Sequence, residues 1–110
     1  MNLFFWRKNK HIDVFAGSLA NELYSAVQPE QMKKYLRLEK GDKKAQKEIR
    51  KIESQFNNAI KLVQQFRATH SLGVYGKARL HLKFIERLEE LGYDKNSAKK
   101  VNEIILLKTP

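Results

Sequence analysis

The longest regular pattern of apolar positions runs from Asp42 to His70. No glycine or proline interrupts this stretch, and its apolar residues recur alternately three and four positions apart, at Ala45, Ile49, Ile52, Phe56, Ala59, Val63 and Phe66. That spacing places them on one side of an α-helix. An isolated helix of this kind is marginal in water, because its apolar side needs a cover. The pattern therefore predicts a long central helix that packs against the rest of the chain or against a second copy.

Four shorter amphipathic segments accompany the long one. We expect helices over residues 13–27, 29–40 and 76–91, and a last helix that holds residues 98–107 and is capped by Asp94 or Asn96. Asp13 is a favourable N-cap for the first of these, and Gly17 and Ala20 are small enough to let another helix approach. Only five glycines and two prolines occur in 110 residues, which argues against an all-β fold because such a fold needs many turns. The sequence predicts an all-α, single-domain bundle of about five helices.

The expected fourth helix carries more apolar surface than one buried side requires. One line of apolar residues comprises Ala78, Leu82, Ile85 and Leu88, and a second comprises Leu80, Phe84 and Leu91. Such a wide apolar surface is typical of a helix that packs on two sides or that binds a partner.

The chain is basic throughout, with a formal net charge of +10. Basic and acidic side chains number seven and four in residues 1–40, seven and three in residues 41–69, and eight and five in residues 70–110. This balance favours anionic partners such as nucleic acid, a lipid surface or an acidic protein. Because the excess is spread evenly, an ordinary basic surface without a dedicated partner is the competing interpretation.

Cations gather on the outer side of the first half of the long helix. They are Lys43, Lys44, Lys47, Arg50 and Lys51. Positive charge near a helix N-terminus is unfavourable, and a broken local rule points toward function. These residues are therefore candidates for binding an anion or a partner. The alternative is a solvated face that Asp42, Glu48 and Glu53 partly neutralise.

A second candidate lies in the connection before the fourth helix. Two glycines three positions apart are followed at once by cations, in the set Gly73, Tyr75, Gly76, Lys77 and Arg79. Backbone N–H groups of such a loop, next to a helix N-terminus, are suited to an anion, and the tyrosine offers a ring or a hydroxyl. The alternative is that the glycines only satisfy turn geometry and packing while Val74 and Tyr75 fill the core.

Residues 1–10 combine aromatic side chains with cations. Phe4, Phe5 and Trp6 precede Arg7 and Lys8. Three interpretations remain open: the aromatics cap the core, the segment is a flexible arm, or it docks on an anionic membrane or a protein. No apolar run approaches the roughly 20 residues that span a bilayer, and positive charges that follow the apolar start reverse the order of a secretory signal. We expect a cytoplasmic protein.

The residue inventory offers little chemistry. There is no cysteine, and His11, His70 and His81 have no second ligand at helical spacing, so we expect neither a metal nor a cofactor. No nucleophile motif, P-loop or dinucleotide fingerprint occurs, so we expect no enzymatic activity and no small-molecule substrate. The sequence favours a non-catalytic binding module, with protein–protein interaction or self-association first. Binding of nucleic-acid phosphates through the two basic candidates is the alternative, and membrane contact through the N-terminal arm is third.

Overall fold

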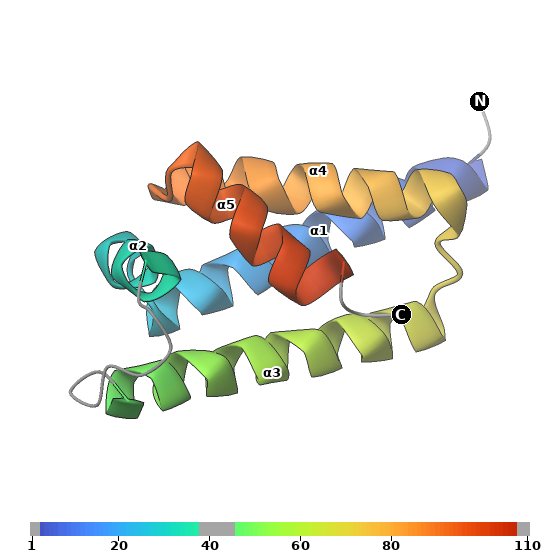
Figure 1. The fold of residues 1–110 in the computed structure, drawn as a ribbon. Helices are drawn as coiled ribbons and strands as arrows, with labels where there is room; N and C mark the ends of the chain where they lie inside the picture. Colours follow the sequence, from blue (N-terminus) through green and yellow to red (C-terminus); the bar gives the residue numbers. More distant parts are fainter. Residues whose placement is uncertain (1–2, 38–45, 108–110) are drawn as a thin grey trace.

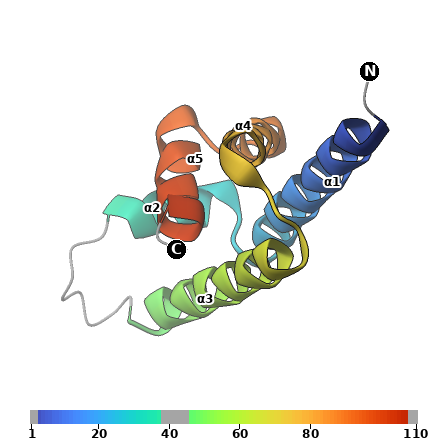
Figure 2. The same cartoon turned by 90° about the vertical axis from the view of Figure 1, so that its right-hand side faces the viewer.

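The computed structural model describes residues 3–37 and 46–107, with side chains over 9–37 and 46–106. Its elements are α1 (Leu3–Ala26), α2 (Pro29–Arg37), α3 (Gln46–Thr69), α4 (Gly73–Leu91), α5 (Lys95–Asn102) and a π-helical turn, η2 (Glu103–Leu107). No strand occurs within these ranges, and the expected all-α bundle of five helices is confirmed (Figure 1). In Figure 2, α1, α3 and α4 lie on three sides of the core and α5 closes the fourth.

The closest helix pair is α1 with α4, and the two helices run in the same direction (Figure 1). Side-chain hydrogen bonds join the two segments at three residue pairs, Asp13 with Arg79, Asn21 with Arg87, and Val27 with Tyr93. Each of these pairs is separated by 66 positions in the sequence. A constant offset means that the two helices stay aligned along their shared length. The helix between them in the chain, α3, runs in the opposite direction.

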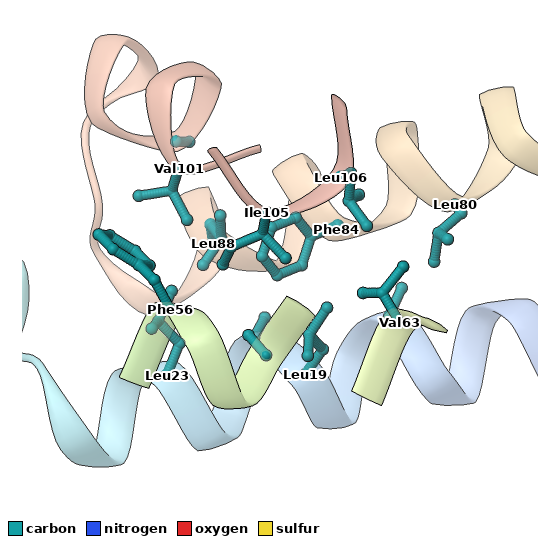
Figure 3. Packing of buried hydrophobic residues seen from close by; sticks show 14 of the residues in the cluster. Leu19, Leu23, Phe56, Val63, Leu80, Phe84, Leu88, Val101, Ile105 and Leu106 are labelled. Carbon is teal, nitrogen blue, oxygen red and sulfur yellow. The ribbon is translucent and has the colours of Figure 1, made fainter. Parts of the chain in front are cut away.

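The apolar stripe of α3 faces the core as the spacing predicts. Its buried members are Ile52, Phe56, Ala59, Val63 and Phe66. The stripe's first position, Ala45, lies outside the described residues, and Ile49 is half-buried. On the other side of the core, α5 lies against α4 and η2 lies against α3. The buried side chains Val101, Ile105 and Leu106 thereby fill the space between α3 and α4 (Figure 3).

A sharp turn between α4 and α5 sets the position of the last helix. Gly92 has a φ of +113°, which favours glycine, and its N–H donates to the Glu89 carbonyl at 3.1 Å. Two residues later the Asp94 carboxylate accepts a 2.7 Å hydrogen bond from the Ser97 N–H. That bond lowers the pKa of Asp94, with smaller effects from nearby cations. Of the two expected caps of the last helix, Asp94 is therefore the one that is used.

Three local expectations are wrong. α1 begins at Leu3, because no breaking residue precedes Asp13, and Asp13 therefore lies inside a helix instead of capping one. α4 begins at Gly73, three residues before the expected Gly76. Gly17 does not receive a neighbouring helix, since a Cβ placed there would have nothing within 4 Å. The expected N-terminal arm has a helical backbone from Leu3, and the side chains of Phe4, Phe5 and Trp6 lie outside the described residues.

A polar pair joins α4 to the end of α5. The Nδ1 atom of His81 lies 2.9 Å from the Asn102 Nδ2 atom and 3.1 Å from its Oδ1 atom. Burial lowers the pKa of His81 below its ordinary value of 6.5; the Asn102 hydrogen bond opposes this effect and the Arg67 charge adds to it. The imidazole is therefore held in its neutral form near pH 7.

Two leucines of α4 test which side of this helix is buried. Leu80 is fully buried, whereas Leu82 is 55% exposed. Leu80→Ala should lower the free energy of unfolding by about 2–5 kcal/mol, because it removes buried methyl groups and leaves a cavity. Leu82→Ala should change it by less than about 0.5 kcal/mol. Urea denaturation of both variants measures the difference, and equal losses would contradict the orientation of α4.

The His81 pair predicts a pH dependence of stability. Because the pKa of His81 is lowered on folding, the unfolded chain binds more protons once the pH falls below about 6.5. The free energy of unfolding should therefore decrease as the pH drops from about 7.5 to 5.5, and His81→Gln should remove part of this decrease. Urea denaturation at both pH values measures it. Identical decreases in the wild type and the variant would show that His81 is not responsible.

Candidate interaction surfaces

The basic residues predicted on the long helix are displayed but are far from the second predicted group. Lys47, Arg50 and Lys51 are exposed near the amino-terminal end of α3, while Lys43 and Lys44 lie outside the described residues. The residues from Gly73 to Arg79 follow the opposite end of α3 (Figure 1). From Lys51 to the end of α3 the helix rises about 27 Å, and the longest dimension of the molecule is 54 Å. The two predicted groups therefore do not form one face.

The expected anion-binding loop is the first turn of α4. Gly73, the first residue of α4, has a φ of +66°, a left-handed conformation that favours glycine. Gly76 is buried, and its N–H donates to the Leu72 carbonyl at 3.1 Å. A Cβ on Gly76 would lie 3.0 Å from the Leu72 Cβ and 3.5 Å from the Ile12 Cδ1. Gly76 is therefore a packing residue that lets Leu72 lie close to the first turn of α4, and its N–H is already used there.

The cations after this turn have different roles. Arg79 donates two 2.8 Å hydrogen bonds, from its Nε and one terminal nitrogen, to the two carboxylate oxygens of Asp13. This bidentate pair raises the pKa of Arg79, with smaller contributions from Tyr75. Lys77 is exposed. The sequence candidate Arg79 therefore holds two helices together, and its charge is neutralised within the chain.

The opposite side of α4 carries the exposed apolar surface. Val74 is 88% exposed and Tyr75 is 53% exposed, so the alternative in which these two side chains fill the core is wrong. With 100° of rotation per residue, Leu82 lies nearly opposite the buried Leu80. The apolar residues seven and four positions before Leu82 and three positions after it lie on the same side of the helix, and with Leu82 they form what we call the outer α4 stripe: Tyr75, Ala78, Leu82 and Ile85. The first three are exposed and Ile85 is half-buried.

The two apolar lines predicted on this helix thus differ in how far they are buried. Leu80 and Phe84 of one line are fully buried, and Leu91 is half-buried. In the other line, Leu88 is also fully buried and belongs to the inner side, while Leu82 is exposed. The surplus apolar surface that the sequence indicates is therefore left uncovered by the described part of the chain.

Three of the four cations on α4 are paired with carboxylates. Besides Arg79 with Asp13, Lys83 lies 3.5 Å from Glu86 and Arg87 lies 3.1 Å from Glu90. The outer α4 stripe is therefore apolar at its centre and bordered by ion pairs. This distribution is typical of protein–protein contact surfaces, which have an apolar centre and a polar rim.

A second surface lies at the other end of the molecule, in a hollow of about 370 Å³ between α2 and α5. Four cations line it, Lys33 and Arg37 from α2 and Lys99 and Lys100 from α5. Sequence reasoning missed this group, because cations near the C-terminus of a helix are stabilising without any ligand. Only the packing of α2 against α5 brings these two pairs together.

Other kinds of site find no support in the described residues. Within residues 3–37 and 46–107, no three histidine, aspartate or glutamate side chains are grouped as a metal ion would require. Over the same ranges, no helix is both long and apolar enough to cross a bilayer. Comparison with known proteins finds no matching family, no matching curated protein and no matching solved structure. The described residues thus offer two candidate interaction surfaces, the outer α4 stripe and the hollow between α2 and α5.

Glycine substitutions distinguish packing from an anion-binding role at the start of α4. Gly76→Ala should lower the stability, because the new Cβ would lie 3.0 Å from the Leu72 Cβ. Gly17→Ala is the matched control: it lies in α1 with nothing within 4 Å, and should raise the free energy of unfolding by about 0.5–1 kcal/mol. Thermal and urea denaturation measure both. A stabilising Gly76→Ala would contradict a tight contact between Gly76 and Leu72.

Proposed function

We propose that the protein is a non-catalytic helical interaction module that binds a protein helix through the outer α4 stripe, and that its partner is a second copy of the same chain. The observation that carries this proposal is the exposure of Val74, Tyr75 and Leu82 on one helix whose inner side is already filled. Covering such side chains is favourable, at about 1.5–3 kcal/mol for each large apolar residue that becomes fully buried.

The order of residue sizes in the stripe supports self-association in an antiparallel arrangement. If two copies of α4 meet antiparallel about the middle of the stripe, Ala78 faces Leu82 and Tyr75 faces Ile85 of the second copy. Small side chains then lie opposite large ones, which helps two helices to interdigitate. A parallel arrangement would place Ala78 against Ala78 and leave a gap. The antiparallel pairing is also an isologous contact, which closes at a dimer.

The length of the stripe sets the expected strength of this contact. From Tyr75 to Ile85 the helix rises only about 15 Å. Such a contact lies at the small end of specific interfaces, where complexes are weak and exchange readily. We therefore expect a dimer that forms at high protein concentration and dissociates on dilution.

Leu82→Glu tests the proposal, because it places a charge in the middle of the stripe at an exposed position that the fold does not require. The matched control is Gln64→Glu, which adds the same charge at an exposed position of α3. Over about a hundredfold range of concentration, sedimentation should show self-association of the wild type and of Gln64→Glu, and a monomer for Leu82→Glu. A wild type that stays monomeric throughout, or a Leu82→Glu variant that associates equally, would overturn the proposal.

Cysteine cross-linking tests the antiparallel arrangement directly, since the chain contains no cysteine of its own. Mixed Ala78→Cys and Leu82→Cys variants should form a disulfide-linked heterodimer faster than either variant links to itself. Homodimers that form faster than the heterodimer would indicate a parallel arrangement and contradict the proposed pairing.

A further inference from the structure

We propose that the hollow between α2 and α5 binds the phosphate groups of a single nucleic-acid strand. This surface lies apart from the outer α4 stripe, and the inference does not depend on self-association. It also uses residues different from the basic candidates that the sequence singles out.

The first observation is that the cations of this hollow are available. Lys33, Arg37, Lys99 and Lys100 are all exposed, and none of them forms an ion pair within 4.0 Å with a residue whose side chain the structure describes. The cations of α4 behave differently, since three of them are paired with carboxylates. Lys33 and Arg37 interact electrostatically with Asp94 without a close ion pair, and exposed cations that converge from two helices in this way form an electropositive surface.

The second observation concerns the two carboxylates in the same hollow. Asp94 binds the Ser97 N–H at 2.7 Å, so its carboxylate is engaged as the cap of α5, and Glu103 is exposed. Both line the hollow with the four cations. Four positive and two negative charges leave an excess of two positive charges, which matches two backbone phosphates of a strand, each with one negative charge.

The chemistry of the cations favours phosphate. A guanidinium such as that of Arg37 presents a planar fork of donors that matches a phosphate, and the ammonium groups of lysine add charge with adjustable geometry. The hollow, at about 370 Å³, lies within the size range of ligand sites. Among the residues that the structure describes, Leu36 is the one apolar side chain that lines it, whereas docking on a lipid surface needs several apolar side chains that insert into the bilayer.

The surroundings of the hollow favour a long polyanion. The amino-terminal end of α3, which carries Lys47, Arg50 and Lys51, lies at the same end of the molecule as α2 (Figure 1). Lys34 on α2 is exposed as well. Positive charge that extends beyond a single hollow suits a strand with a phosphate at each nucleotide, because each neutralised phosphate releases counterions and adds to affinity.

Fluorescence anisotropy with labelled single-stranded RNA and DNA of about 20 nucleotides tests the proposal. The site variants are Lys33→Gln with Arg37→Gln, and Lys99→Gln with Lys100→Gln. The matched control is Lys61→Gln with Lys77→Gln, which removes the same charge from exposed positions of α3 and α4. Each site variant should bind at least about tenfold more weakly than the control variant, and its affinity should depend less steeply on salt between about 50 and 200 mM.

Unlabelled polyanions that compete with the labelled strand show which kind of polyanion the hollow prefers. Unlabelled RNA or DNA strands should displace the probe, and inorganic polyphosphate should displace it less well at equal phosphate concentration. Polyglutamate of similar length should displace it poorly. Equal or better competition by polyphosphate or by polyglutamate would overturn the assignment to a nucleic-acid strand, as would flotation with phosphatidylserine vesicles that the site variants abolish.

Two other outcomes would overturn the proposal entirely. One is an absence of strand binding by the wild type at low salt. The other is an equal loss of affinity in the site variants and the control variant, which would show that only net charge matters. Circular dichroism confirms that each variant is folded, and Leu82→Glu should bind the strand as the wild type does, which separates this inference from the proposed self-association.

Discussion

The packing of α4 against α1 is the contact on which the positions of both candidate surfaces depend. The Arg79–Asp13 contact marks the register of this pair, and two further hydrogen bonds repeat the same offset of 66 positions. Gly76 contributes at the start of α4, since it leaves room for Leu72. With this register, Leu80, Phe84 and Leu88 are buried and Leu82 must point outward. The surplus apolar side chains of α4 are thus a consequence of how its inner side is held.

The same alignment decides where positive charge gathers. α3 lies between α1 and α4 in the sequence. Because α1 and α4 run in the same direction, α3 runs back along the length of the molecule in the opposite direction. Its ends are therefore far apart, and the basic residues near Gln46 cannot join those near Gly73. The turn at Gly92 instead sends α5 across the core toward α2. Cations that are distant in the sequence are brought together there, at the end of the molecule where α3 begins.

The regular spacing of apolar residues made the fold class and the buried side of α3 predictable. Residues that recur alternately three and four positions apart lie on one side of an α-helix. The role of Asp13 was not predictable, since N-cap preference is a local rule and its partner lies 66 positions away. Both apolar lines of α4 could be identified in the sequence, but Leu88 can be assigned to either line. The packing in the structure shows which line is buried in the core. The cations of the hollow between α2 and α5 were not predicted as a group. The favourable interaction of cations with a helix C-terminus already accounts for the pair on α2 and for the pair on α5 when each helix is considered alone.

The parallel pairing of α1 with α4 also has a consequence for how the chain folds. Helices that follow one another usually pack as antiparallel neighbours, and their contacts form after only a short loop closes. Here the helix pair with the most extensive contact, α1 with α4, closes a loop of 66 residues, which is more than half of the chain. The entropy of that closure has to be overcome before the pair stabilises anything. During synthesis, α1 leaves the ribosome long before α4 exists, and the part of its apolar side that α4 covers stays without that partner until α4 has emerged.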